Sequence, residues 1–231
     1  MSLRRLALPL AVLLLAGCGG QRGHGSARLW ITRDRGAAVL FTGRVPAGIT
    51  ALQALDRVAK VKTRYGGRFV QSIDGLSGSL SAQRDWFYFV NGIEADRSAA
   101  EYRLHPGDLE WWDYRSWRHA MSVPVVIGAF PEPFLHGYDG RRRRTVVAYE
   151  PGARRAAEAI ARVVRGRVVP LRTGLPGNAN EVLVHPAVAP SSLAIGRGPT
   201  TPVLLSVTPR DALRLARDPS LVRFRYQGVP Q

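Results

Sequence analysis

The sequence of 231 residues predicts an α+β protein with two domains: a small mixed sheet crossed by one helix, followed by a smaller α/β domain. Short alternating apolar runs separated by glycine-bearing turns fill the first half, whereas strand-like and helix-like patterns alternate in the second. All five tryptophans precede residue 118, and a connection rich in proline and glycine runs from Phe130 to Gly140. We therefore predict domains over residues 27–136 and 145–231, joined by a basic linker over residues 137–144.

The N-terminus is typical of a lipoprotein signal peptide. A short basic stretch precedes the apolar run Leu6 to Leu14, and small residues lead directly to Cys18, the only cysteine in the chain. We predict a signal peptide over residues 1–17, acylation of Cys18 by palmitate-like chains, and a flexible tether over residues 18–26. The alternative is an ordinary signal peptide followed by a buried free cysteine. The favoured interpretation places the protein outside the cytoplasm, lipid-anchored to the cell membrane.

The formal net charge of +16 comes almost entirely from arginine. We predict no nucleic-acid partner, because export is predicted and the basic residues are spread out rather than gathered along one helix. The charge indicates either contact with an anionic membrane surface or the composition of an arginine-rich genome. The run Arg141 to Arg144 is interpreted as a solvated linker, with lipid or partner contact as the alternative.

The first domain opens with a predicted hairpin, in which residues 28–32 and 38–42 pair around Asp34-Arg35-Gly36. Thr50 can cap the helix that follows, because Gln53 lies three residues later and apolar residues recur at helical spacing. Further strands are predicted, separated by turns with glycine, over residues 68–73, 86–90 and 109–115.

Strand alternation divides the aromatic residues of this domain by face. Phe87 and Phe89 point one way and are expected on the dry face under the helix, while Trp86 and Tyr88 point the other way. At least two large rings are therefore expected on the outer face, away from the helix, where they suit a flat ligand or a wet interface. The alternative is that a second layer or the C-terminal domain covers them.

Several short motifs occur together in this domain: Thr50-Ala51-Leu52, Tyr88-Phe89-Val90-Asn91-Gly92, Tyr102, Gly107-Asp108, Trp112 and Tyr114. As a set, they make residues 27–118 resemble the transcobalamin-like C-terminal domain, a β-grasp-like module of bacterial surface proteins. In transcobalamin this module forms half of a cobalamin site, and a large helical barrel forms the other half. The rest of this sequence is too short and wrongly patterned for such a barrel.

The resemblance implies where a ligand site would lie. Its positions fall on Trp86, Tyr88, Asn91, Trp112 and Tyr114, which would contact a ligand by stacking and hydrogen bonding rather than by metal coordination. The resemblance allows a corrinoid as the ligand. No cofactor is predicted.

The second domain is predicted to alternate strands and helices. Thr208-Pro209-Arg210-Asp211 is a strong helix start, with a hydroxyl cap, a proline in the first turn and an acidic residue after it. A ferredoxin-like sandwich is one topology that the order of elements allows. The predicted strands cover residues 145–149, 167–171, 181–185 and 222–226 and the neighbourhoods of Leu193 and Leu204, and the helices cover residues 153–165 and 209–216.

No pattern predicts an enzyme or a metal site. The spacing of Asp85, Glu101, Asp108 and Asp113 forces no two carboxylates together, and the five histidines are scattered. We expect a membrane-anchored lipoprotein that binds a small molecule, such as a corrinoid or a related vitamin, through its aromatic surface and serves an uptake system with a membrane transporter. The alternative is an envelope module for protein interaction or scaffolding that binds no small ligand.

Overall fold

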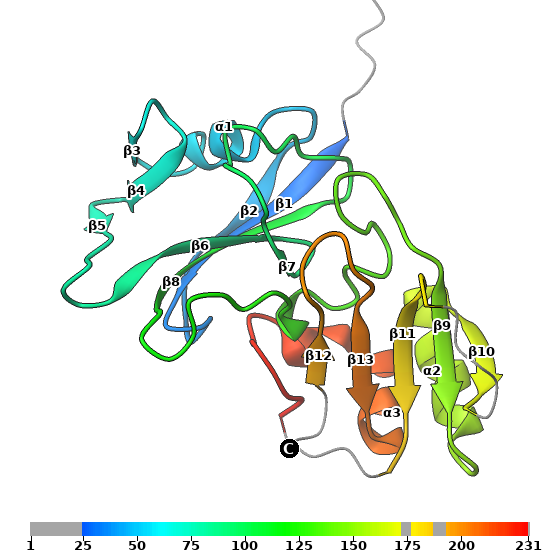
Figure 1. The fold of residues 1–231 in the computed structure, drawn as a ribbon. Coiled ribbons are helices and arrows are strands. Elements are labelled where there is room, and N and C mark those ends of the chain that lie inside the picture. Colours follow the sequence, from blue (N-terminus) through cyan, green and yellow to red (C-terminus); the bar gives the residue numbers. More distant parts are fainter. Residues whose placement is uncertain (1–24, 172–176, 187–192, 231) are drawn as a thin grey trace, which may run out of the picture.

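The computed structural model describes residues 25–171, 177–186 and 193–230 (Figure 1). The predicted signal peptide and Cys18 lie outside these residues. In the part described, no helix combines the length and the apolar character needed to cross a membrane. The chain folds into two sheets of five strands and one of three, with short helices packed against them, so the predicted α+β class is confirmed.

A five-stranded sheet forms the centre of the first domain, in the order β2-β1-β8-β6-β7. β1 and β8 pair in parallel and the other neighbours are antiparallel, so the sheet is mixed, as predicted. The Asn91-Gly92 turn joins β6 to β7 with positive φ at both residues, as a two-residue hairpin requires. The strands are β1 (Ser26–Arg33), β2 (Ala38–Pro46), β6 (Arg84–Val90), β7 (Ile93–Glu94) and β8 (Leu109–Ser116).

One face of this sheet is covered by helix α1 (Ala51–Asp56) and by a small sheet of β3 (Val61–Arg64), β4 (Phe69–Ile73) and β5 (Leu76–Ser77) (Figure 1). α1 begins with the predicted capping box: the Thr50 hydroxyl accepts the Gln53 backbone N–H, and the Gln53 side chain accepts that of Thr50. Ala54 and Leu55 of α1 then share one apolar core with the buried residues of β4.

The rings divide between the two faces of the sheet as alternation predicted, but the helix covers the opposite face from the one expected. Trp86, Trp112 and Tyr114 lie in the core under α1 and β4, whereas Phe89 and Trp111 lie on the other side. Alternation fixes which side chains share a face and says nothing about which face a helix crosses. The predicted outer position of Trp86 and Tyr88 is therefore wrong, because Tyr88 also packs against the core under α1.

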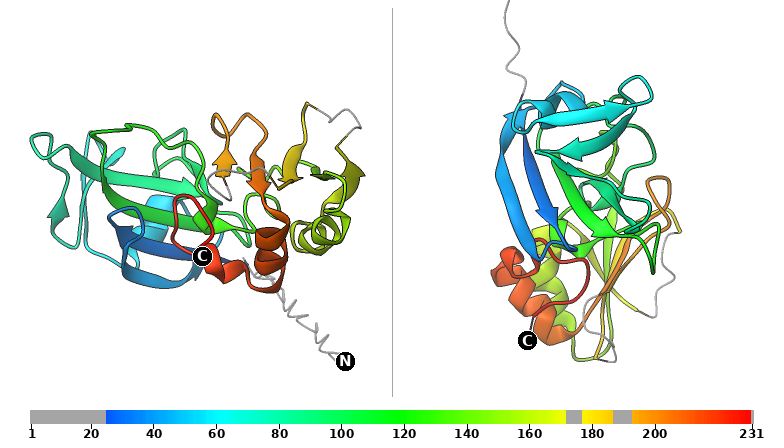
Figure 2. Two further views of the ribbon diagram at one scale, coloured as in Figure 1. Left: turned by 90° about the horizontal axis from the view of Figure 1, so that it is seen from below. Right: turned by 90° about the vertical axis from the view of Figure 1, so that its left-hand side faces the viewer.

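The second domain is built on a sheet in the order β10-β9-β11-β13-β12. All neighbouring pairs except β12 with β13 are parallel, which does not fit the ferredoxin-like sandwich, whose sheet is mostly antiparallel. α2 (Arg154–Val164) connects two adjacent parallel strands as a crossover helix, and α3 (Pro209–Arg217) lies beside it on the same side of the sheet (Figure 2). The strands are β9 (Thr145–Tyr149), β10 (Arg167–Pro170), β11 (Asn180–Val184), β12 (Leu193–Ile195) and β13 (Leu204–Val207).

The last described residues return to the first domain (red in Figure 2). The strand predicted over residues 222–226 is wrong: the chain forms a 3-10 helix, η2 (Pro219–Val222), and then an irregular segment. Its apolar residues are explained by packing rather than by sheet pairing. Phe224 and Tyr226 contact the aromatic residues on the open face of the first sheet, namely Trp30, Phe89 and Trp111, beside η1 (Ile127–Ala129).

Candidate functional site

A cavity of about 440 Å³ opens in the first domain between the central sheet and the β4 side of its cover. We call it the aromatic cavity. β6 and β8 supply its floor and β4 supplies one wall, while the chain that follows β7 supplies the other. Its lining residues are Gly67, Arg68, Phe69, Val70, Trp86, Phe87, Tyr88, Glu94, Ala95, Arg97, Ser98, Ala99 and Trp112.

The floor of the aromatic cavity is a fixed stack of rings. Tyr88 and Trp112 are cross-strand partners whose centroids lie 4.8 Å apart at an interplanar angle of 19°. The polar tips of both rings are already used inside the protein. The Tyr88 hydroxyl donates to the carbonyl oxygen of Arg97 at 2.5 Å, and Trp112 Nε1 donates to Glu110 Oε1 at 2.5 Å. These rings therefore offer ring surface, not hydrogen bonds, to an occupant.

Trp86 forms the second part of the floor. Its Nε1 donates to the carbonyl oxygen of Leu76 in β5 at 2.8 Å, which holds the indole under the small sheet. Only 5% of Trp86 and 3% of Trp112 is exposed to solvent, so an occupant reaches them only along the edge that the cavity leaves open. Tyr88 is half-buried and presents more of its ring.

The rim carries the exposed groups of the cavity. Phe69 is 39% exposed, and its ring meets the still more exposed Tyr65 at 6.3 Å. Arg68 pairs with Glu101 beside it, and the Ser98 hydroxyl donates to the Arg68 carbonyl oxygen at 2.6 Å. An aromatic pair and a guanidinium thus stand together at the mouth of the cavity.

Burial raises the pKa of Tyr88, and the nearby carboxyl groups of Glu110 and Asp96 act in the same direction. Its hydroxyl therefore stays protonated at neutral pH. Arg97 keeps its charge, because its hydrogen bonds with Asp96 raise its pKa further. The aromatic cavity accordingly combines a neutral aromatic floor with two guanidinium groups, those of Arg68 and Arg97, each paired with carboxylates beside it.

The structure brings together three of the five predicted ligand-binding residues, Trp86, Tyr88 and Trp112. Tyr114 is not part of the lining: it packs on Trp86 with centroids 5.2 Å apart and donates to the Ser77 carbonyl oxygen. Asn91 lies elsewhere and is fully buried. Its amide donates to Asp108 and to the carbonyl oxygen of Gly137, and accepts the backbone N–H of Leu109. Asn91 therefore fastens the linker to the first domain.

Sequence reasoning missed Phe69, Arg68 and Arg97. The available signal was the turn Tyr65-Gly66-Gly67, where positive φ at all three residues makes a tight hairpin that leaves Phe69 at its base. The position of Arg97 depends on the fold, because it follows β7 in a segment without periodic pattern. Among the described residues, no three His, Cys, Asp or Glu side chains are grouped so that they could hold a metal ion.

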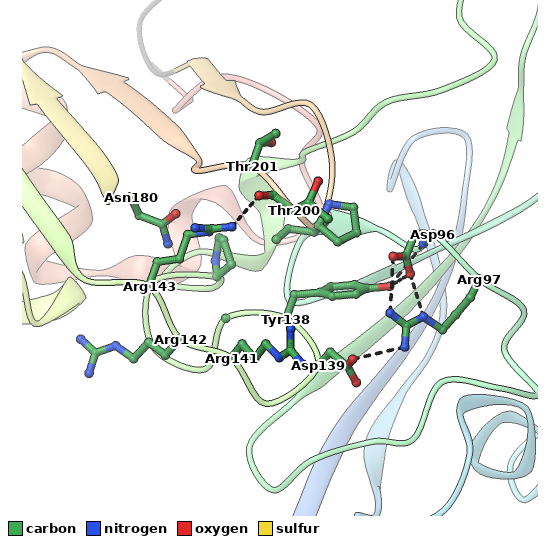
Figure 3. A pocket seen from close by; sticks show the side chains of 14 residues that line it. Asp96, Arg97, Tyr138, Asp139, Arg141, Arg142, Arg143, Asn180, Thr200 and Thr201 are labelled. Carbon is green, nitrogen blue, oxygen red and sulfur yellow. Dashed lines mark hydrogen bonds and ion pairs between the residues drawn. The ribbon is translucent and has the colours of Figure 1, made fainter. Parts of the chain in front are cut away.

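A second cavity, of about 490 Å³, lies where the two domains meet (Figure 3). We call it the junction cavity. On its first-domain side, Arg97 bridges Asp96 at 2.9 Å and Asp139 at 3.2 Å, and the Tyr138 hydroxyl donates to Asp96 at 2.8 Å. Its other side is formed by the predicted linker and by residues near β11 and β13, including Asn180, Thr200 and Thr201. Arg97 thus stands between the two cavities and contributes to both.

Comparison with known proteins finds one family model that matches part of the chain. Residues 48–116 match the model of a domain of unknown function, DUF4430. Every residue that lines the aromatic cavity falls within this match. No curated protein matches the chain.

Two solved structures show a loose similarity. A candidate metal-binding protein from Ruminococcus gnavus is 13% identical, with a TM-score of 0.34, over 40% of this chain and 97% of that chain. Haptocorrin in complex with Cbi is 14% identical, with a TM-score of 0.33, over 39% of this chain and 25% of that chain. The match therefore covers about a quarter of haptocorrin, and the transcobalamin-like resemblance stays a prediction.

Proposed function

We propose that this chain is a membrane-anchored extracytoplasmic lipoprotein that binds a small molecule in the aromatic cavity. The observation that carries the proposal is that Trp86, Tyr88 and Trp112, which the sequence indicated as ligand contacts, line one cavity of about 440 Å³. This volume lies within the range of roughly 300–1,000 Å³ that is usual for small-molecule sites. The proposed role is binding and includes no catalytic step.

The lining indicates the chemistry of the ligand. Because the polar tips of Tyr88 and Trp112 are used within the protein, these residues offer contact with the flat part of a ligand. At the mouth, the exposed guanidinium of Arg68 pairs with Glu101 and can also donate to a carbonyl or carboxylate oxygen of a ligand, whereas Arg97 is occupied by Asp96 and Asp139. A planar ring system with acceptor groups at its edge satisfies both requirements.

A corrinoid or related vitamin has this combination of a ring system and peripheral amide carbonyls. A corrinoid is larger than the aromatic cavity, so one edge of the ring would enter while the rest stayed at the mouth beside Phe69 and Arg68. Acylation of Cys18 and the short tether would hold such a site near the membrane, where a transporter could receive the ligand. This arrangement suits a role in uptake.

Tryptophan fluorescence of the full-length chain in nonionic detergent tests the proposal, with cobinamide, cobalamin and riboflavin as ligands. We expect saturable quenching, after correction for ligand absorbance, by at least one of them. Phe69→Ala should weaken binding about tenfold, because it removes ring contact at the exposed rim. Leu80→Ala, at an 84% exposed position outside the cavity, is the matched control and should bind as the native chain does.

Trp86→Ala and Trp112→Ala are less suitable for this test, since truncating a buried tryptophan costs about 3–5 kcal/mol of stability. Quenching by none of the ligands up to millimolar concentration would count against a vitamin ligand. Equal binding by the native chain and Phe69→Ala would count against the aromatic cavity as the site.

A second candidate function, protein interaction in the envelope, is favoured by the edge of the central sheet. β2 is the outermost strand, and its neighbouring residues Val39 and Leu40 are 48% and 52% exposed. An exposed strand edge with apolar side chains can take up a strand from a partner. Cross-linking from a Leu40→Cys variant in envelope membranes would detect such a partner, and keeping Cys18 retains the proposed lipid anchor.

A further inference from the structure

Five arginines surround a third cavity, of about 1120 Å³, at the edge of the second domain. We call it the arginine cavity. Its lining residues lie at the amino ends of the parallel strands β9 and β10. Figure 1 shows the chain entering the second sheet at this end of β9. Its lining contains Arg142, Arg143, Arg144, Arg165 and Arg167, and none of its lining residues is acidic.

The positive charges of the arginine cavity are not neutralised inside the protein. In the described part of the chain, none of the five guanidinium groups forms an ion pair with a carboxylate. Like charges gathered at one place repel each other, and a cavity that they surround concentrates anions from solution. The arrangement is therefore incomplete without a negatively charged occupant.

Two of the arginines are held in place by backbone oxygens. Arg142 Nε donates to the carbonyl oxygen of Phe134 at 2.8 Å, and Arg142 Nη2 donates to the carbonyl oxygen of Arg165 at 3.2 Å. Arg143 donates to the carbonyl oxygens of Asn178 and Thr200, at 3.4 Å and 2.5 Å. These bonds orient the guanidinium groups and leave their charge available. Figure 3 shows Arg143 reaching toward Thr200 from the linker.

Arg165 occupies a backbone conformation that favours glycine. It follows the last residue of α2 with φ 51° and ψ 45°, in the left-handed region. A residue with a side chain costs roughly 1 kcal/mol more than glycine there. The positive charge at a helix C-terminus offsets part of this cost. An arginine at this position, rather than a glycine, gives the arginine cavity its fifth positive charge.

We propose that the arginine cavity binds a multiply charged phosphate group, carried either by a soluble phosphate ester or by an anionic lipid headgroup. Guanidinium groups match phosphate oxygens in geometry and form strong charge-assisted hydrogen bonds with them. The cavity is wide enough for several linked phosphates. It shares Arg142 and Arg143 with the junction cavity and no residue with the aromatic cavity, so it forms a second, separate binding site.

Calorimetric titration of the full-length chain in nonionic micelles with sodium tripolyphosphate, at physiological salt, tests this site. The triple variant Arg144→Gln, Arg165→Gln, Arg167→Gln keeps the two anchored arginines and should weaken binding at least about tenfold. The matched control is Arg155→Gln, Arg162→Gln, Arg217→Gln, which removes the same charge from exposed positions on α2 and α3. This control should change the affinity by less than about threefold.

Arg165→Gly separates binding from folding. It should weaken tripolyphosphate binding while leaving the melting temperature unchanged or higher, because glycine relieves the left-handed backbone. Doping the micelles with phosphatidic acid, whose headgroup is a phosphate monoester, distinguishes the two sources: displacement of tripolyphosphate identifies a lipid headgroup, and lack of displacement identifies a soluble phosphate. The absence of measurable tripolyphosphate binding, or equal losses in the two triple variants, would overturn the proposal. Neither result depends on whether the aromatic cavity binds a vitamin.

Discussion

At the scale of single residues, Glu110 is a buried carboxyl group whose hydrogen bonding is incomplete. It is fully buried in β8 behind the floor of the aromatic cavity. One carboxyl oxygen accepts the Trp112 indole N–H, and the other has no hydrogen-bond partner among the described residues. Burial raises the pKa of Glu110 well above its usual value, and the charge of Asp108 acts in the same direction. The carboxyl group is therefore favoured in its neutral form in the folded protein.

The stability of the protein should consequently fall as pH rises. Above the usual glutamate pKa of about 4.5 the unfolded chain loses the Glu110 proton, while the folded chain retains it until its own higher pKa is reached. Stability is thus fully present below the usual pKa and is lost progressively up to the folded pKa. Glu110→Gln removes this dependence and should raise the free energy of unfolding at pH 8 by on the order of 1–3 kcal/mol.

Urea unfolding at pH 5 and pH 8 measures this effect. Asp56→Asn, at an exposed position at the end of α1, is the control and should follow the native chain at both pH values. A Glu110→Gln variant that is less stable than the native chain at pH 8 would show that the carboxylate is needed, through a partner such as a bound water or ion.

The residue scale also shows why the site was only partly predictable. The resemblance implied Trp86, Tyr88 and Trp112 together, and the structure shows why they meet: on two paired antiparallel strands, alternation brings alternate residues to one face. Asn91 looked equally suitable for a ligand, yet its amide is used between Asp108 and the linker. Nothing in the sequence near Asn91 reveals that Gly137, far along the chain, approaches it.

At the scale of elements, α1 depends on its start. It has six residues, and a helix of this length is not stable alone. Its position on the sheet is fixed by the capping box of Thr50 and Gln53 and by the burial of Ala51, Ala54 and Leu55. The sequence pattern identified this helix because capping and apolar spacing are local signals.

Thr50→Ala should therefore cost about 1 kcal/mol of stability, since the backbone N–H of Gln53 loses its acceptor at the helix N-terminus. Thr50→Ser keeps the hydroxyl and should restore nearly all of this loss, which separates the cap from the methyl group. Thermal or urea unfolding of both variants is sufficient. Equal losses in Thr50→Ala and Thr50→Ser would show that the methyl packing, not the hydrogen bond, supports the helix.

Elements without local signals were missed. β3 has three exposed residues among four, so no alternation marks it, and β5 has only two residues. The ferredoxin-like topology was wrong for a related reason: the order of strands and helices along the chain is compatible with several sheets. The parallel neighbours β9, β10 and β11 become evident only when their register is known.

At the scale of the whole molecule, the C-terminal segment joins the two domains. The Tyr226 hydroxyl donates to the buried Asp113 at 2.8 Å, and Asp113 also accepts the Thr32 hydroxyl and the backbone N–H groups of Arg35 and Gly36. Gly36 has positive φ, and a side chain there would collide with the carbonyl oxygen of Phe224. A residue near the C-terminus thereby completes the first hairpin of the protein. Pattern analysis could not show this, because the contact joins residues at opposite ends of the chain.

Tyr226→Phe tests this connection with the smallest possible change. The ring stays in place against Trp111 and Phe89, but Asp113 loses one of its donors, so we expect a loss of about 1–2 kcal/mol in the free energy of unfolding. Tyr65→Phe removes an exposed tyrosine hydroxyl from the first domain and should be neutral. Because the contact spans both domains, the C-terminal segment should also become more sensitive to limited proteolysis in Tyr226→Phe and not in Tyr65→Phe. Unchanged stability and proteolysis would mean that the ring packing alone holds the segment, with Asp113 sufficiently satisfied by Thr32, Arg35 and Gly36.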